Sequence, residues 1–320
     1  MNLKTKMERL IQNSYGNMAG MVVKKKGDIV YEKYYNGYTE DNPIHIFSVT
    51  KSIVSILIGI ALDKKLIHSE NDKVLDYFPD YEVKRGEKTI QEITLYHLMT
   101  MTAPYRQKKD NYTEFFTSDD WVRYALDHLG GRDKIGEFRY APLIGPDILT
   151  GILVKVTGKS VLEFATEELF APLGIVVDGN VRFQDKEEQL EWYEKRDVKG
   201  WVADPQGVNT AGWGLTLKVR DMAMIGQLYL DSGRFDGRQI VSEDWVKECT
   251  TVKSRWEKMG YGYLWWIIDE KERCYAGLGD GGNVIYVNEA KEMVVAIGSV
   301  FDKGAKDRVK LIREYVEKVF

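Results

Sequence analysis

The chain has 320 residues, of which 44% are hydrophobic and 29% are charged, and its formal net charge is -4. This balance is typical of a soluble globular protein with one large domain or two closely packed lobes. Because neither sign of charge dominates, we expect no binding to nucleic acid or to an acidic membrane surface.

The cysteines and histidines are few and scattered. The spacing of Cys249 and Cys274 matches neither a metal site nor a disulfide framework, and the 4 histidines form no cluster. We therefore expect no metal and no cofactor. The N-terminal segment is charged and lacks the apolar core of a secretory signal, and no run approaches the roughly 20 apolar residues of a membrane span. The sequence thus predicts a cytoplasmic protein without a membrane span, or an exported one if a signal has been removed.

The first elements in chain order are a helix, a hairpin and a second helix. Residues 5–18 are predicted to be helical, and residues 20–38 are predicted to form a β-hairpin around a Lys-Gly-Asp turn. A helix that is apolar on almost every face then runs from about Ser48 to Lys65. Further helical segments are expected at 72–81, 89–103, 118–129, 137–158, 160–175, 219–233 and 242–250. Residues 104–120 are suited to a loop or lid, and residues 178–206 are charged and irregular.

The end of the chain is rich in predicted strands. These are expected at 261–269, 273–279, 283–290 and 291–300, before a closing amphipathic helix over 305–320. Strands at both ends of a chain most simply join one antiparallel sheet. We therefore expect an α+β fold, in which N- and C-terminal segments form a sheet flanked by helices and a mainly helical lobe is inserted. The expected organisation is a single domain over 1–320, with an α/β lobe at about 1–65 and 255–320 and a helical lobe at about 66–254.

Ser48 and Lys51 form the pattern S-x-x-K at the start of the apolar helix. Residues three apart share one helix face, so the hydroxyl and the amine can approach each other. A serine hydroxyl is a weak nucleophile until a base takes its proton, and burial favours the neutral form of a lysine, which can be that base. The N–H groups at a helix start suit a developing oxyanion.

A simpler interpretation of these two residues is structural. Ser48 could cap the helix, and Lys51 could extend its amine to the surface along its apolar stem. The pattern has only two fixed positions and is common by chance. The apolar surroundings of Lys51 favour the catalytic interpretation.

Several ordered segments resemble the serine β-lactamase and penicillin-binding-protein-like hydrolases, in particular the branch of esterases and peptidases related to class C β-lactamases. The resemblance covers about residues 18–315. It is carried by "HIFSVTKSIVSILIGIALDKKLI", "NDKVLDYFPDY", "ITLYHLMTMTA", "FRYAPLIGPDILTGILVKVTG", "NTAGWGLTLKVRDMAMIGQLYLDSG", "YGYLWW" and "GLGDGGNVIYV". Together these motifs are far more specific than S-x-x-K alone.

The resemblance implies a role for each matching residue. Ser48 would be the acylated nucleophile, Lys51 its base, and Tyr140 of "FRYAP" a second general acid or base. The strand motif K-T-G or H-x-G of the family would fall on Asp280, Gly281 and Gly282. The backbone N–H of Asn283 would then join that of Ser48 in the oxyanion hole.

Two positions depart from the family pattern. Pro142 stands where the tyrosine motif Y-x-N has asparagine, which removes an amide that contacts substrate in relatives. Asp280 replaces a basic or neutral residue and should repel a substrate carboxylate. Alternatively, Asp280 is simply a turn residue, since Asp-Gly favours tight turns.

The expected function is hydrolysis of a small ester, amide or peptide-like substrate through an acyl-enzyme. An esterase is favoured over a true β-lactamase, because Asp280 disfavours carboxylate-bearing substrates. The alternatives are a catalytically weak penicillin-binding or ligand-sensing protein on the same fold, and a D-amino-acid peptidase or amidase.

Two further motifs have competing interpretations. "GLGDGG" is a literal G-x-G-x-x-G, but a β-branched, alternating segment follows it where a dinucleotide site needs a helix, so nucleotide binding is rejected. The aromatic segment "YGYLWW" at 261–266 is suited to a substrate pocket on one face, while alternation along a strand predicts core packing on the other.

Overall fold

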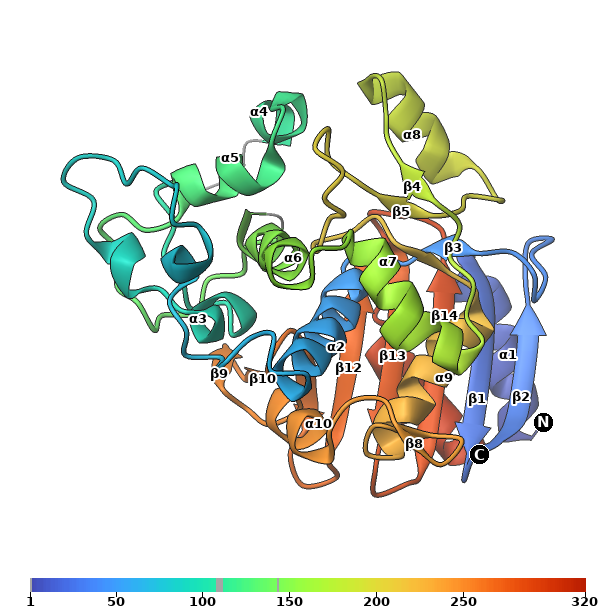
Figure 1. Ribbon diagram of the computed structural model, residues 1–320. Helices are drawn as coiled ribbons and strands as arrows, with labels where there is room; N and C mark the ends of the chain where they lie inside the picture. Colours follow the sequence, from blue (N-terminus) through green and yellow to red (C-terminus); the bar gives the residue numbers. More distant parts are fainter. Residues whose placement is uncertain (1, 108–111, 143) are drawn as a thin grey trace.

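The computed structural model describes residues 2–107, 112–142 and 144–320. Its centre is an eight-stranded antiparallel sheet in the order β2-β1-β14-β13-β12-β11-β10-β9 (Figure 1). The strands are β1 Met18–Lys25, β2 Asp28–Tyr34, β9 Ser254–Trp256, β10 Met259–Tyr261, β11 Trp266–Asp269, β12 Cys274–Gly279, β13 Asn283–Asn288 and β14 Met293–Ser299. Strands from both ends of the chain therefore form one sheet, because β1 pairs with β14.

Three short strand pairs lie outside this sheet. They are β3 Ile44–His45 with β6 Thr216–Leu217, β4 Asn180–Val181 with β5 Trp201–Val202, and β7 Arg234–Phe235 with β8 Arg238–Gln239. The first pair matters most for function, because β3 leads directly into the helix that carries Ser48.

Helices pack on both faces of the sheet and form a separate, mainly helical part. The helices of the described chain are α1 Leu3–Ser14, α2 Val49–Asp63, α3 Leu95–Met99, α4 Tyr112–Thr117, α5 Trp121–His128, α6 Ile144–Thr157, α7 Val161–Ala165, α8 Lys186–Glu194, α9 Val219–Leu230, α10 Glu243–Cys249, α11 Arg308–Leu311 and α12 Glu317–Val319. Short 3₁₀ segments lie at η1 Val74–Tyr77, η2 Thr89–Glu92, η4 Ala171–Leu173 and η5 Asp280–Gly282, and π-helical turns lie at η3 Thr166–Phe170 and η6 Ile312–Val316. Helices α2 and α9 pack against one face, while α1 and the C-terminal helical segment cover the other (Figure 1).

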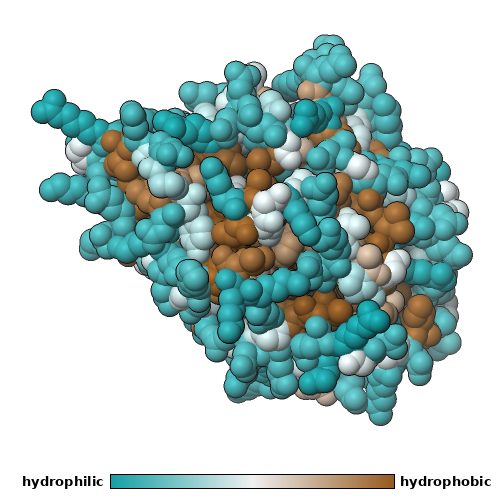
Figure 2. Space-filling view, viewed as in Figure 1, coloured by the Kyte–Doolittle hydropathy of each residue, from teal (hydrophilic) through white to brown (hydrophobic). Residues whose placement is uncertain are grey.

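The alternation of side chains along each strand explains this two-sided packing. In β13, Ile285 and Val287 belong to the large core beneath α2 and α9, whereas Val284 and Tyr286 belong to the smaller core beneath α1. Successive side chains of a strand point to opposite faces, so a sheet covered on both sides needs apolar residues at every position. Outside these cores the surface is mainly hydrophilic, with apolar side chains in separate patches (Figure 2).

The predicted α+β class, the single antiparallel sheet and the inserted helical segments are confirmed. The differences lie in residues 261–269 and in the polar connections. The predicted strand 261–269 is interrupted, because β10 ends at Tyr261 and β11 begins at Trp266. Residues 178–206 contain the helix α8, which Asp185 caps by accepting a hydrogen bond from the Glu188 N–H (2.9 Å), and the short strands β4 and β5. The predicted lid at 104–120 contains the helix α4, and residues 108–111 of it lie outside the described part of the chain.

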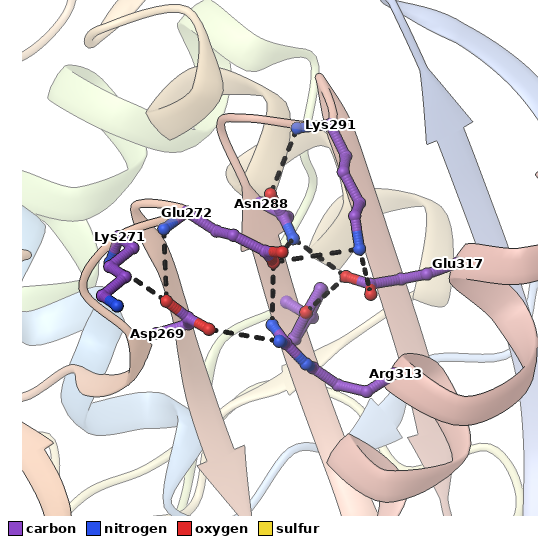
Figure 3. A network of polar contacts seen from close by, with 8 residues as sticks. Asp269, Lys271, Glu272, Asn288, Lys291, Arg313 and Glu317 are labelled. Carbon is purple, nitrogen blue, oxygen red and sulfur yellow. Dashed lines mark hydrogen bonds and ion pairs between the residues drawn. The ribbon is translucent and has the colours of Figure 1, made fainter.

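A network of charged and polar side chains fastens the C-terminal helical segment to the sheet (Figure 3). Glu317 accepts hydrogen bonds from Tyr286 (2.6 Å), Asn288 (2.9 Å) and Lys291 (2.5 Å). Arg313 pairs with Asp269 and Glu272 at 3.2 and 2.9 Å. Apart from Tyr286 within β13, the partners of Glu317 and Arg313 lie at the β11–β12 and β13–β14 connections, at the end of β12 opposite Gly279.

Among the described residues, we find no helix with the length and apolar character needed to cross a membrane.

Candidate active site

Ser48 stands immediately before the first residue of α2 and is partly exposed. The preceding residue, Phe47, has a left-handed backbone (φ 48°), which is costly for a non-glycine residue and is characteristic of functional sites. The Ser48 side chain makes no capping hydrogen bond to the helix. The geometry therefore argues against Ser48 as a simple helix cap.

Lys51 lies one helical turn further on and is only 2% exposed. Its Nζ donates hydrogen bonds to Ser48 Oγ (2.8 Å) and to the Gly212 carbonyl oxygen (2.8 Å). The amine is directed into the protein and does not reach the surface, because apolar side chains surround the rest of α2. The short Lys51–Ser48 hydrogen bond is a path along which a proton can pass between the two groups.

The loop around Gly212 completes this pair. Its carbonyl oxygen also accepts a hydrogen bond from Ser48 Oγ (3.3 Å). Two buried side chains fix the loop on either side: the Ala211 N–H donates to Asp147 Oδ1 (2.6 Å), and the Gly214 N–H donates to His45 Nε2 (2.9 Å). The Gly212 carbonyl is therefore held toward Ser48 and Lys51.

Both buried side chains have displaced pKa values. Burial raises the pKa of Asp147 to about 7, although the Ala211 N–H and the charge of Lys51 oppose this shift. Asp147 Oδ2 has no hydrogen-bond partner among the described residues. Burial lowers the pKa of His45 to about 3, so its imidazole is neutral and can accept the hydrogen bond from Gly214.

Tyr140 lies beside Lys51, as the sequence pattern suggested. The centroid of its ring is 5.4 Å from Lys51 Nζ, and its side chain is 36% exposed. The segment that carries it precedes α6 and has no regular secondary structure. Ser48, Lys51 and Tyr140 are thus brought together from two segments about ninety residues apart.

The strand residue that lies against Ser48 is Gly279, the last residue of β12. A Cβ atom at Gly279 would lie 2.3 Å from the Ile46 carbonyl oxygen and 3.2 Å from the Ser48 nitrogen. The neighbouring strand β11 pairs with β12 only as far as Ala276, so beyond Ala276 the edge of β12 has no strand partner on that side within the described part of the chain. Its polar backbone groups are available to a substrate.

The residues predicted to carry the strand motif lie just beyond the end of β12. Asp280, Gly281 and Gly282 form the 3₁₀ turn η5 and not the strand beside Ser48. Asn283 opens the next strand, β13, where its buried amide group bonds to Ser299 and to the Asp280 carbonyl. The physical reason is that the chain must turn sharply after Gly279, and glycines with left-handed φ at the second and third positions of the turn allow this.

Asp280 itself is exposed at the rim of the site. Burial raises the pKa of Tyr193, and the negative charge of Asp280 raises it further, which indicates that the two side chains are near each other. The ring of Tyr193 lies 5.9 Å from that of Phe47, and Phe301 lies 5.4 Å from Phe47. One side of the site is thus aromatic with a carboxylate at its edge.

Sequence reasoning missed Gly212, Asp147 and His45. A backbone carbonyl such as that of Gly212 has no residue-specific signature. Asp147 is the only acidic residue within the apolar helix α6, and this isolation is a signal that could have identified it. Within the described ranges, no three His, Cys, Asp or Glu side chains gather closely enough to hold a metal ion.

Comparison with known proteins places this geometry in context. A family model described as Beta-lactamase matches residues 7–319. The 6-aminohexanoate-dimer hydrolase of Paenarthrobacter ureafaciens is 22% identical over 297 residues, which cover 86% of this chain and 70% of that protein.

Solved structures show the same fold. The octameric penicillin-binding protein homologue from Pyrococcus abyssi has a TM-score of 0.73 at 22% identity, covering 99% of this chain and 76% of that one. A family VIII carboxylesterase has a TM-score of 0.70 at 15% identity, covering 98% and 96% of the two chains. The family model spans nearly the whole chain, and this protein therefore belongs to the Beta-lactamase family of serine hydrolases, which includes esterases and amidases.

Proposed function

We propose that the protein hydrolyses a small ester or amide through an acyl-enzyme on Ser48, and that its activity is closer to that of an esterase than to that of a β-lactamase. The observation that carries this proposal is the 2.8 Å hydrogen bond between the buried Lys51 amine and the partly exposed Ser48 hydroxyl. A buried amine beside an accessible hydroxyl is the arrangement that activates a serine nucleophile.

In the proposed reaction, Lys51 takes the Ser48 proton while Oγ attacks the substrate carbonyl. Tyr140, next to the Lys51 amine, transfers a proton to the leaving group and later helps to activate the water that releases the acid. The Gly212 carbonyl oxygen accepts hydrogen bonds from Ser48 and Lys51 and so keeps the two side chains in position before the attack.

We place the oxyanion hole at the start of α2 and the end of β12. One donor is the Ser48 N–H, which lies beside Gly279. The other is the N–H of Asp280, the residue that follows the strand segment Gly277–Gly279 lying along α2. In this proposal Asp280 takes the place of Asn283 as the second oxyanion donor. The rule is unchanged, because the donor is still the residue that follows the strand motif.

The preference for esters and neutral amides rests on Asp280. A carboxylate at the rim repels the carboxylate of a penicillin or of a peptide C-terminus. An amidase is a second candidate, because the curated relative is named for hydrolysis of 6-aminohexanoate dimers. A weakly catalytic penicillin-binding or sensing protein is the third, motivated by Pro142 and Asp280.

Steady-state hydrolysis of p-nitrophenyl acetate and butyrate tests the proposal and separates these candidates. We expect turnover in the wild type, loss of nearly all of it in Ser48→Ala, and a fall of about 10²-fold in Tyr140→Phe, which is the usual scale for a general acid or base. Acylation without turnover would favour the sensing protein. Equal rates in the wild type and Ser48→Ala would contradict the proposed function.

A further inference from the structure

We infer that a row of three aromatic rings, those of Tyr140, Trp266 and Trp256, is a subsite that binds an extended, uncharged apolar chain of the substrate. The inference rests on the proposed function and names the class of substrate for the same site. It assigns a binding role to aromatic residues of the β9–β11 edge. Along the sequence, these residues are far from Ser48 and Lys51.

The row begins at the reacting groups. The ring of Tyr140 lies 5.4 Å from Lys51 Nζ, and the ring of Trp266 lies 5.8 Å from that of Tyr140 at an interplanar angle of 36°. The ring of Trp256 follows at 6.0 Å from Trp266. Consecutive rings at these separations present an almost continuous apolar surface that leads away from Ser48.

The row has a rigid base. Tyr261 is buried and meets Trp266 edge-on at 4.7 Å, and Phe138 contacts both Tyr261 (5.6 Å) and Trp266 (6.3 Å). Trp266 also pairs across the sheet with Tyr261 and with Ala276. These contacts fix the rings before a ligand arrives, which reduces the entropy lost on binding.

The two adjacent tryptophans have different environments. Trp265 is fully buried and packs on Tyr229 and Tyr275, whereas Trp266 packs against the same core and remains partly exposed. Core packing therefore accounts for all of Trp265 but for only part of the Trp266 ring. Trp256 is 52% exposed on β9, the edge strand of the sheet. Its ring continues the apolar surface that Tyr140 and Trp266 begin.

The chemistry of the row specifies its ligand. Its rings offer apolar faces, and Arg255, the charged residue of β9, is paired with Glu270 (2.5 Å). The chain bound there is therefore uncharged along its length. The rings of Tyr140, Trp266 and Trp256 follow one another at 5.8 and 6.0 Å. A methylene chain that starts at the reacting groups and reaches Trp256 along these apolar surfaces therefore needs about twelve carbon atoms.

A matched pair of esters tests the subsite and shows which side of the scissile bond it binds. Ethyl dodecanoate and dodecyl acetate are isomers that place the twelve-carbon chain on the acyl side or on the leaving-group side, and ethyl acetate is the short reference. The readout is kcat/KM for each long ester divided by kcat/KM for ethyl acetate. Hydrolysis is measured as acid release at constant pH.

We expect one of the two isomers to be favoured over ethyl acetate by about tenfold in the wild type, since each fully buried methylene is worth up to about fourfold. Trp256→Ala should lower that ratio about tenfold, and Trp256→Phe should restore most of it. The matched control is Ile29→Ala, because Ile29 is 49% exposed on β2, at the opposite end of the sheet. This control should keep the wild-type ratio.

The outcomes separate this inference from the proposed function. Ser48-dependent hydrolysis with no preference for either long ester, or with a preference that Trp256→Ala leaves intact, would overturn the subsite alone. Hydrolysis of all three esters that does not depend on Ser48 would overturn both. Thermal unfolding of each variant shows that the exposed substitutions have not unfolded the protein.

Discussion

At the scale of single residues, the site depends on a buried carboxyl group that does not touch the substrate. Asp147 is 2% exposed, accepts the Ala211 N–H, and thereby helps to hold the Gly212 carbonyl toward Lys51. Its burial makes its ionisation unfavourable, and its pKa is raised to about 7. This shift makes the stability of the folded protein depend on pH.

The expected effect has a definite sign. Between about pH 4 and pH 7, the unfolded chain ionises Asp147 while the folded protein keeps it protonated, so stability falls as pH rises. The loss accumulates to about 4 kcal/mol by pH 7. Asp147→Asn removes this pH-dependent loss. The unfolding free energy of the variant minus that of the wild type should therefore become more positive as pH rises from about 4 to about 7. Urea unfolding at pH 4, 5.5 and 7 measures this, and a difference independent of pH would contradict it.

Asp280 gives a prediction about specificity. Replacing it by asparagine keeps the size of the side chain and removes the negative charge at the rim. We expect acylation by benzylpenicillin, a carboxylate, to accelerate about threefold to tenfold, with a smaller gain at high salt because exposed charges are screened. Hydrolysis of neutral p-nitrophenyl butyrate serves as the internal comparison. Intact-mass measurements follow acylation, and a gain equal for both substrates would argue against electrostatic selection.

At the scale of elements, the close packing of β12 on α2 sets the position of Ser48. Gly277 and Gly279 allow this approach, because a Cβ at Gly277 would lie 2.8 Å from Ser52 Oγ of α2, and a Cβ at Gly279 would lie 2.3 Å from the Ile46 carbonyl oxygen just before α2. Gly279→Ala should therefore displace Ser48 or the strand edge and lower kcat about 10²-fold, as small displacements of reacting groups do. Gly16→Ala is the control, since nothing lies within 4 Å of its Cβ position. Wild-type kcat in Gly279→Ala would show that this approach is not needed.

Local spacing and long-range assembly were not equally predictable. Ser48 and Lys51 are three residues apart on a helix, so their proximity follows from helical geometry alone. Gly212, Asp147 and His45 meet them only through the packing of α6, β3 and the loop before β6, and a sequence pattern does not encode such meetings. The residue of β12 that lies against Ser48 was not predictable, because "GLGDGG" contains several glycines and its spacing does not say which one lies against the helix.

The fold itself was predictable in outline. Alternating apolar residues in β13 and β14 and the apolar run of α2 determine a sheet covered by helices. The structure of the polar segment 178–206 was not predictable. Its helix α8 has no clear apolar period and is stabilised by its cap at Asp185 and by the packing of Trp192.

At the scale of the whole molecule, the network around Glu317 fastens the C-terminal helical segment to the sheet (Figure 3). It lies at the start of β12, whereas Ser48 lies beside Gly279 at the other end of that strand. Burial alone would raise the pKa of Glu317, but hydrogen bonds from Lys291, Tyr286 and Asn288 lower it below the ordinary glutamate value. Because the folded state favours the carboxylate, this stabilisation is present above about pH 4.5 and is lost as pH falls further.

Glu317→Gln tests whether this network stabilises the fold without affecting the site. We expect a loss of about 1 to 3 kcal/mol in unfolding free energy at pH 7, because the half-buried Lys291 amine and the buried Tyr286 hydroxyl lose a charged acceptor. The loss should shrink in acid, and kcat per folded molecule should stay at the wild-type value. A large fall in kcat at full folding would show that the network is coupled to catalysis.

The central claim is that Ser48 is the nucleophile and that Lys51 activates it. The most direct measurement is intact-mass analysis with peptide mapping after exposure to a fluorophosphonate, performed on the folded wild type, Ser48→Ala and Lys51→Met. The account predicts one adduct on Ser48 in the wild type, none in Ser48→Ala, and labelling slowed at least about 10²-fold in Lys51→Met. A folded wild-type protein without an adduct, or with the same adduct in Ser48→Ala, would contradict it.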